Sequence, residues 1–133
     1  MSVAFDAFLF DNKHDAIGAE VGVYAGGHAE RLIDSGHIKT IYLVDPYGAA
    51  PEYDECVVKP AGWTPEKWLN AKASAWQLFL KHRDKVIPMH FRSSEAAPLI
   101  ADSSLDFVYI DGNHNKDQVA VDLNSWWSKV GIG

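Results

Sequence analysis

The stretch from Gly18 to Gly27, which reads G-A-E-V-G-V-Y-A-G-G, limits most strongly what this chain can fold into. Small and β-branched residues up to Val23 predict a buried strand. The strand breaks into Gly26 and Gly27, and the following H-A-E-R-L-I places apolar residues on one face of a helix. Glycines at such a turn let backbone N–H groups approach a ligand, and the helix directs its positive end towards it. The stretch predicts half of a ligand-binding βαβ unit.

Further along the chain, strand-like and helix-like segments alternate. Strands are predicted at 39–45, 85–91 and 105–111, and Pro88 assigns the second of these to a sheet edge. The helix after the glycine turn should end near Ser35-Gly36. This alternation predicts an α/β fold, a Rossmann-like doubly wound parallel sheet with strand order 3-2-1-4.

Three more helices are predicted. Residues 3–12 form a short amphipathic pattern, and Thr64-Pro65-Glu66 is a strong start for a helix that runs to about His82. The apolar residues expected to face the core from that helix are Trp68, Leu69, Trp76, Phe79 and Leu80. The last helix should place Val119, Leu123, Trp126, Trp127 and Val130 on one buried stripe. The aperiodic residues 48–62 are expected to form a lid or substrate loop.

Composition limits the partners and the compartment. The chain of 133 residues is one domain, 1–133, with a formal net charge of -6 and no run of Lys or Arg. This acidic balance argues against nucleic acid or an anionic membrane as partner. Cys56 is the only cysteine, so an intramolecular disulfide and a cysteine-rich zinc site are excluded. The N-terminus shows neither a signal peptide nor a membrane span, which makes the cytoplasm the expected location.

Asp45, at the carboxyl end of the strand 39–45, is a candidate ligand-binding residue. An acid at this position can accept hydrogen bonds from both ribose hydroxyls of a nucleoside cofactor. It lies about twenty residues beyond the glycine turn, as such a role requires. Alternatively, Asp45 before Pro46 initiates a turn.

Two stretches resemble class I S-adenosylmethionine-dependent methyltransferases of the small-molecule group. Glu20, Gly22 and Gly26 match the first motif of that family, an acid followed by G-x-G-x-G, with Tyr24 in place of the middle glycine. F-V-Y-I-D-G-N-H, followed by V-x-x-D-L-x-x-W-W-x-K-V, is similar to the fourth strand and next helix of the family. With Asp45 and the element order, the resemblance covers nearly the whole chain.

The resemblance implies a cofactor site for S-adenosylmethionine. The implied cofactor-binding residues are Glu20, Gly22, Val23, Tyr24, Gly26, Asp45, Pro46, Ser93, Ser94 and Asp111. The backbone of the glycine turn would hold the methionine part, Asp45 the ribose, and Ser93 or Ser94 the adenine, although helix capping explains these serines equally well.

Methyl transfer to a hydroxyl or amine of a small molecule is the implied reaction. His114 suits removal of the acceptor proton, with Asp111 as its partner or alternative, while a solvated loop histidine is the competing interpretation. Some related O-methyltransferases use a divalent metal, and Asp111 with His114 suggests one here. Two ligands do not make a site, so no metal-binding residue is assigned. The remaining histidines have no spacing that suggests a metal: His14, His28, His37, His82 and His90.

Two other function classes remain open. An NAD-dependent oxidoreductase would need G-x-G-x-x-G after the first strand, and that pattern is missing. A non-catalytic or incomplete cofactor-binding domain is the other, because the sequence supplies four strands where the family has seven. Residues 129–133 look like the entry to a fifth strand. The strand 105–111 would leave an apolar edge, which predicts a homo-oligomer or a partner chain that covers it.

Overall fold

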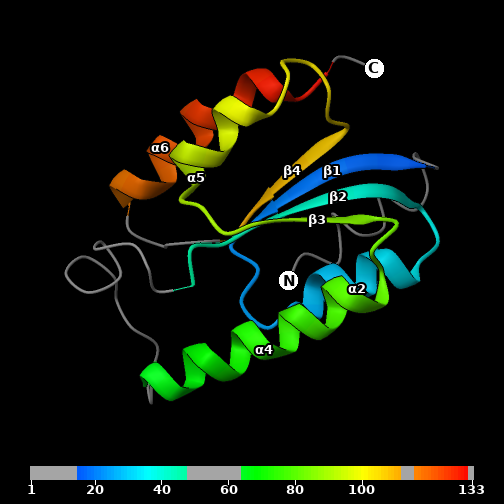
Figure 1. Cartoon of the computed structure of the whole chain (residues 1–133). Helices are drawn as coiled ribbons and strands as arrows, with labels where there is room; N and C mark the ends of the chain where they lie inside the picture. Colours follow the sequence, from blue (N-terminus) through cyan, green and yellow to red (C-terminus); the bar gives the residue numbers. More distant parts are fainter. Residues whose placement is uncertain (1–14, 48–63, 112–115, 132–133) are drawn as a thin grey trace.

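Four parallel strands form the centre of the structure, a computed structural model that describes residues 15–47, 64–111 and 116–131 (Figure 1). Their order is β3-β2-β1-β4, and each neighbouring pair is parallel. The bounds are Ala16–Val21 for β1, Ile38–Val44 for β2, Val86–Met89 for β3 and Phe107–Ile110 for β4. The predicted doubly wound sheet and its strand order are confirmed, and Pro88 lies in an edge strand.

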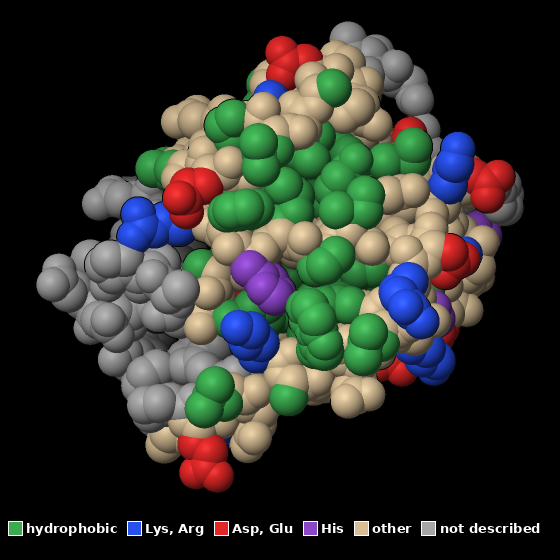
Figure 2. Space-filling model, viewed as in Figure 1, with side chains coloured by type: hydrophobic (Ala, Val, Ile, Leu, Met, Phe, Trp, Pro, Cys, Tyr) green, Lys and Arg blue, Asp and Glu red, His purple; other side chains and the backbone are tan. Residues whose placement is uncertain are grey.

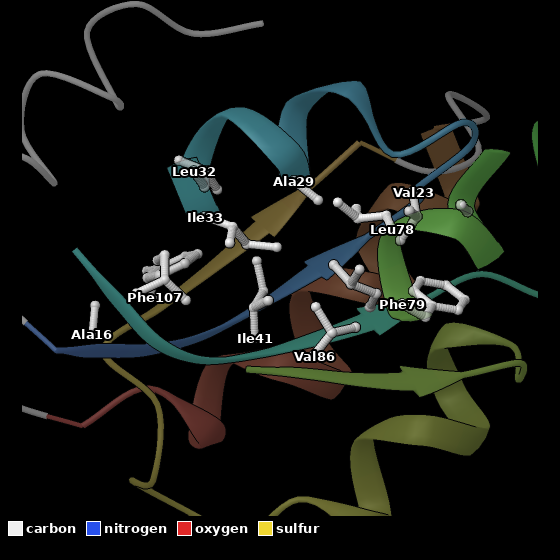
Figure 3. Packing of buried hydrophobic residues seen from close by; sticks show 13 residues of the cluster. Ala16, Val23, Ala29, Leu32, Ile33, Ile41, Leu78, Phe79, Val86 and Phe107 are labelled. Atoms are coloured by element: carbon white, nitrogen blue, oxygen red, sulfur yellow. The ribbon is translucent and has the colours of Figure 1, made fainter. Parts of the chain in front are cut away.

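Helices cover both faces of this sheet. Figure 1 shows α2 (Gly27–Asp34) and α4 (Pro65–Lys81) on one face, and α5 (Ser93–Ala96) and α6 (Lys116–Trp126) on the other. Short 3-10 turns at Ala97–Leu99 and Trp127–Lys129 extend the second layer. Each face has its own buried cluster, since successive strand residues point to opposite sides. The cluster under α2 and α4 includes Leu32, Ile33, Ile41, Leu78, Phe79 and Phe107 (Figure 3).

The two edge strands, β3 and β4, are shorter than predicted, and so is β1. The strand expected at 85–91 is limited to Val86–Met89, and that expected at 105–111 to Phe107–Ile110. The first strand ends at Val21 and does not reach Val23, because Gly22 takes a positive φ of 92°. Extended geometry stops where the backbone turns to form the glycine loop.

The predicted ends of two helices are confirmed. Thr64 caps α4 with its side-chain oxygen, which accepts the Lys67 N–H at 3.2 Å, and Pro65 occupies the first helical position. The helix α2 ends at Asp34, and Gly36 then takes a φ of 81°, as expected of a residue just past a helix end.

The predicted buried face of α4 is wrong for three residues. Leu69, Trp76 and Leu80 are exposed, Leu69 by 68%. The buried stripe consists of Ala71, Ala75, Leu78 and Phe79, spaced i, i+4, i+7 and i+8. Phe79 was correctly assigned, and the side chain of Trp68 lies outside the described part of the chain. Small alanines let the helix approach the sheet closely, and the large apolar residues are displaced to its flanks.

The predicted stripe of α6 is also wrong in part. Trp126 is fully buried as predicted, but Leu123 is exposed and Trp127 is 84% exposed. The second inward residue is Asp122, one turn before Trp126. The Trp126 indole Nε1–H donates to the Ser93 hydroxyl oxygen at 2.8 Å, so this bond to α5 sets which side of α6 faces inward.

Gly18 in β1 allows a close contact with the neighbouring strand β4. A Cβ atom placed on Gly18 would lie 2.2 Å from the ring of Phe107, which is far inside van der Waals contact. The two residues are paired in register across β1 and β4. The Phe107 ring therefore fills the volume that a side chain at position 18 would need.

Residues after α6 return to the outer side of β4. Val130 forms an isolated parallel bridge with Leu105, in which Leu105 N–H donates to the Lys129 carbonyl at 2.9 Å and Gly131 N–H to the Leu105 carbonyl at 2.8 Å. A parallel segment thus begins beside β4, where the sequence predicts entry to a fifth strand. The predicted helix at 3–12 and loop at 48–62 lie outside the described residues.

Apolar side chains are also found on the surface. Figure 2 shows hydrophobic side chains gathered across the face seen in Figure 1, with charged side chains around them. Exposed large apolar residues near the β3 edge of the sheet include Ile87 of β3 and Phe91 just after it. Within the described ranges, no helix is both long and apolar enough to cross a membrane.

Candidate functional site

Three acidic residues come together at the carboxyl ends of β1, β2 and β4. Glu20 is the fifth residue of β1, Asp45 follows β2 directly, and Asp111 follows β4 directly. The Asp111 N–H donates to the Val21 carbonyl at 2.7 Å, which fixes the end of β4 against the end of β1. In open parallel sheets, ligands bind at this edge, where the strand order reverses. Here that point lies between β1 and β4.

The glycine turn between β1 and α2 passes through three left-handed residues. Gly22, Tyr24 and Gly26 have φ angles of 92°, 54° and 89°. Tyr24 replaces the middle glycine of the family motif, yet it keeps the backbone conformation that glycine adopts most readily. Gly26 is the N-cap of α2 and offers no side-chain hydrogen bond to the first turn of the helix. A helix N-terminus with a glycine cap is suited to binding an anionic group of a ligand.

Asp45 holds the glycine turn against the end of β2. Its Oδ2 accepts the N–H groups of Val23 and Tyr24, each at 3.0 Å, and its Oδ1 accepts the Tyr47 N–H at 2.8 Å. Asp45 is 2% exposed, and this burial raises its pKa although the three backbone hydrogen bonds act to lower it. The bond to Tyr47, two residues on, is the turn interaction considered from the sequence.

Asp45 keeps some capacity for the ribose contact. A carboxylate oxygen has two lone pairs, and Oδ1 uses one of them for Tyr47. The ribose role of Asp45 stays a prediction. The role of the Val23 and Tyr24 amides in holding the methionine part is restricted, because Asp45 already accepts both of their N–H groups.

Aromatic residues extend the site towards β3, and of these Tyr47 was not predicted from the sequence. The Tyr47 hydroxyl donates to the Tyr24 carbonyl at 2.8 Å, and its ring meets the His90 ring edge-on at 5.5 Å. The ring centres of Trp76 and Phe79, both in α4, lie 5.9 Å and 6.0 Å from that of His90. Burial, and then the positive charge of Lys72, lower the pKa of His90. Tyr47 therefore links the glycine turn to the residue that follows β3.

Glu20 and His28 form a buried pair, and His28 was also missed. The Nδ1 atom of His28, the second residue of α2, is hydrogen-bonded to Glu20 Oε1. Glu20 is 2% exposed, and among the described residues no donor reaches its second oxygen, Oε2. Burial raises the pKa of Glu20, and the pairing with His28 opposes that rise. An acid in the middle of a buried strand needs a partner, and the first turn of the next helix is where one could have been sought.

The remaining predicted residues are placed differently. Ser93 is buried and accepts the bond from Trp126, so the structure gives it a packing role; Ser94 is exposed. The cap of α5 uses Glu95, whose Oε1 accepts the Arg92 N–H at 3.0 Å, and not either serine. Their contact with adenine stays a prediction. Pro46 is partly buried beside Asp45, and Asp111 is exposed, while His114 lies outside the described residues.

A metal site finds no support in the described ranges. Within 15–47, 64–111 and 116–131, no group of three or more His, Cys, Asp or Glu side chains is arranged to hold an ion. The suggestion of a divalent metal near Asp111 and His114 remains untested, since His114 is outside these ranges.

Comparison with known proteins gives the family. Residues 16–133 match the model of a family described as a methyltransferase domain. The chain belongs to this methyltransferase-domain family. The matched region contains the glycine turn, Asp45 and the Asp111 loop, and it confirms the resemblance to class I methyltransferases that these residues carried in the sequence. No curated protein matches the chain by sequence.

Solved structures with low sequence identity share the fold of this methyltransferase domain. Spermidine synthase from Thermotoga maritima has a TM-score of 0.62 at 11% identity, over 96% of this chain and 38% of its own. The 1,6-didemethyltoxoflavin-N1-methyltransferase of Burkholderia thailandensis, with bound 1,6-didemethyltoxoflavin and S-adenosylhomocysteine, has a TM-score of 0.59 at 16% identity. That match covers 95% of this chain and 45% of the other. The chain thus spans less than half the length of either protein.

Proposed function

We propose that this chain binds S-adenosylmethionine at the carboxyl edge of the sheet and serves methyl transfer to a hydroxyl or amine of a small molecule. The observation that carries the proposal is the pair of buried acids, Glu20 and Asp45, on either side of the glycine turn. Family membership supports the reaction class. The toxoflavin methyltransferase, which shares the fold, was solved with S-adenosylhomocysteine and a small-molecule compound bound.

The residues present fit the chemistry of this cofactor. Glu20 Oε2 is a buried acceptor that lacks a donor among the described residues, and it suits the ammonium of the amino-acid end. The N-terminus of α2, with Gly26 as a cap that lacks a side chain, suits the carboxylate of the same end. The second lone pair of Asp45 Oδ1 suits a ribose hydroxyl. Gly27 has open space beside it, which would let the ligand approach the backbone.

The bound cofactor would supply a methyl group already activated by a positive sulfur. The protein then has to position the acceptor in line with this group and to exclude water. A hydroxyl or amine acceptor must also lose a proton. We assign that task to Asp111, which follows β4 directly at the edge that carries the glycine turn, or to His114, three residues further along the sequence. Asp111 is exposed and can accept a proton from a bound molecule.

A partner along the outer side of β4 belongs to the same proposal. Val108, Tyr109 and Ile110 are only partly buried, and the described contact on that side is the bridge at Leu105 and Val130. A second copy or a partner chain that covers this edge would shield these side chains from water. Light scattering of the purified chain tests this part, and a monomer over the whole concentration range would contradict it.

Calorimetric titration of the purified chain with S-adenosylmethionine, S-adenosylhomocysteine and NAD tests the cofactor. We expect micromolar affinity for the two sulfur compounds and none for NAD. Binding of NAD alone would favour an oxidoreductase, and the absence of all binding by folded protein would overturn the proposal. Because the chain spans less than half of the compared proteins, binding without turnover is the second candidate. Methylated product from a panel of hydroxyl and amine acceptors would exclude it.

A further inference from the structure

We propose that His28 is a positioning residue, which holds Glu20 through Oε1 and so presents Oε2 to the cationic end of the ligand. This inference rests on the proposed cofactor site, and it assigns a role to a residue for which neither the family match nor the sequence pattern provides one. The claim concerns orientation and charge. His28 itself is not required to touch the reacting atoms.

The geometry fixes His28 from several elements at once. Glu20 of β1 is paired in register with Tyr109 of β4, so both side chains point to the face covered by α2. His28 enters this space from the first turn of α2, where its Nδ1 is bonded to Glu20 Oε1. The centre of its ring lies 4.3 Å from that of Tyr109, at an interplanar angle of 39°. Because the His28 ring packs against Tyr109 and is hydrogen-bonded to Glu20, the Glu20 carboxylate has one defined orientation.

The orientation leaves one oxygen for a ligand. Glu20 is 2% exposed, and a buried carboxylate oxygen without a hydrogen bond is costly unless another group meets it. Donors from the described residues do not reach Oε2, while Oε1 is held by His28. The unsatisfied oxygen therefore points to a donor that binds later, and a positively charged donor gives the strongest bond.

The charges around Glu20 explain why a histidine is needed. Burial raises the pKa of Glu20, and the negative charges of Asp111 and Asp45, at the ends of β4 and β2, raise it further. His28 is the group that lowers it, through the hydrogen bond and through its charge when protonated. Without His28, Glu20 would take up a proton at a higher pH. A protonated carboxyl group loses most of its attraction for an ammonium.

The test is calorimetric binding of S-adenosylhomocysteine between pH 5 and pH 8. In the wild type, affinity should fall on the acid side as Glu20 is protonated. In His28→Ala, we expect this fall to begin at a higher pH, and affinity at pH 7 to be about tenfold lower. His28→Asn keeps an N–H donor near the position of Nδ1 and should recover part of the affinity. A loss of equal size at every pH would mean a merely structural role and would overturn the inference.

A shorter ligand provides a control within each variant. 5′-Methylthioadenosine keeps the nucleoside and the sulfur but lacks the amino-acid end. Its affinity should be unchanged within about twofold in His28→Ala and Glu20→Gln, since neither residue is proposed to contact the nucleoside. A parallel loss for both ligands would contradict the assignment. His82→Ala is the matched protein control, because His82 lies 4.0 Å from Asp34 in another histidine–acid pair, beyond the end of α4.

A measurement without ligand separates this inference from the proposed function. NMR titration of the free protein follows the side-chain carboxyl carbon of Glu20. The pKa of Glu20 should be higher in His28→Ala than in the wild type. If the wild type binds no sulfur compound, the proposed function fails and the positioning role fails with it. If the wild type binds and the pKa of Glu20 is the same in both proteins, the positioning role alone is refuted.

Discussion

Glu20, in β1, and Asp45, directly after the neighbouring β2, are two acids with the same 2% exposure, and they have different hydrogen-bond partners. Asp45 receives three backbone N–H groups, from Val23, Tyr24 and Tyr47, and fastens the glycine turn. Glu20 is held by one histidine, and its second oxygen has no donor among the described residues. One acid thus maintains the shape of the site, whereas the other keeps an unused acceptor inside it.

This difference separates stability from binding at a single edge of the sheet. Unsatisfied buried polar groups each cost about 1–3 kcal/mol, so a fold retains them where they have a use. Replacing Asp45 should therefore harm the folded state and the binding of a ligand together. Replacing Glu20 should harm binding and spare the folded state.

The largest effect is expected for Asp45→Ala. Three backbone N–H groups lose their acceptor, and we expect the free energy of unfolding to fall by about 2–4 kcal/mol and cofactor affinity to fall at least tenfold. Urea unfolding and calorimetry measure the two changes. Asp106→Ala is the matched control, since Asp106 Oδ2 accepts the Ile17 N–H at 2.9 Å at an exposed position near the other end of β1. Equal losses in the two variants would remove the distinction between them.

For Glu20→Gln we expect a smaller change in the free energy of unfolding, and this change is a gain. The pKa of Glu20 is raised from its ordinary value of 4.5, so the folded state binds the proton more tightly than the unfolded chain does. Its contribution to stability is present below pH 4.5 and is lost as the pH rises through the raised pKa. Glu20→Gln lacks this loss, and its advantage over the wild type should grow from pH 4.5 to pH 7.5, to about 1 kcal/mol. Urea unfolding at several pH values checks this, and a difference that is constant or reversed with pH would contradict it.

The smallest effect on stability is expected for Gly27→Ala. An added Cβ meets nothing within 4 Å, and alanine reduces the freedom of the unfolded chain, so a gain of about 0.5 kcal/mol is expected. Cofactor affinity should nevertheless fall severalfold if the ligand lies over this turn. Gly26→Ala is the contrasting variant, because its φ is 89° and its Cβ would lie 3.1 Å from Leu78 Cδ2; it should lose about 1–2 kcal/mol. Unchanged affinity in Gly27→Ala would place the ligand elsewhere.

Much of the fold could be predicted because buried parallel strands are local in sequence. Runs such as I-Y-L-V and F-V-Y-I, bounded by turn residues, define the strands, and the connection rules then give their order. Helix faces were harder to predict. In α4 the stripe of Ala71, Ala75 and Leu78 is buried, whereas the larger Leu69 and Trp76 are not. Hydrophobicity ranks the large residues first, but the distance between helix and sheet favours small ones.

The site was predictable where a residue acts through its place in the chain. Asp45 follows from its place at a strand end, Glu20 and Asp111 follow from stretches that resemble the family, and the structure brings all three to one edge. His28 and Tyr47 were missed because their importance lies in contacts across elements, with Glu20 and with Tyr24. Ser93 was predicted as a site residue, but its hydroxyl accepts a hydrogen bond from Trp126, 33 residues away in the chain. Such partners depend on helix docking, which periodicity does not determine.

The contact between Gly18 and Phe107 couples the side-chain sizes at two positions that are far apart in the sequence. The Phe107 ring occupies the place that a side chain at position 18 would need, because a Cβ atom built on Gly18 would lie 2.2 Å from the ring. Neither residue can therefore change in size alone. A larger residue at 18 requires a smaller one at 107, and the reverse substitution would leave a void between β1 and β4. The two positions should therefore vary together among related sequences. A chimera of two related proteins should fold only when β1 and β4 both come from the same parent.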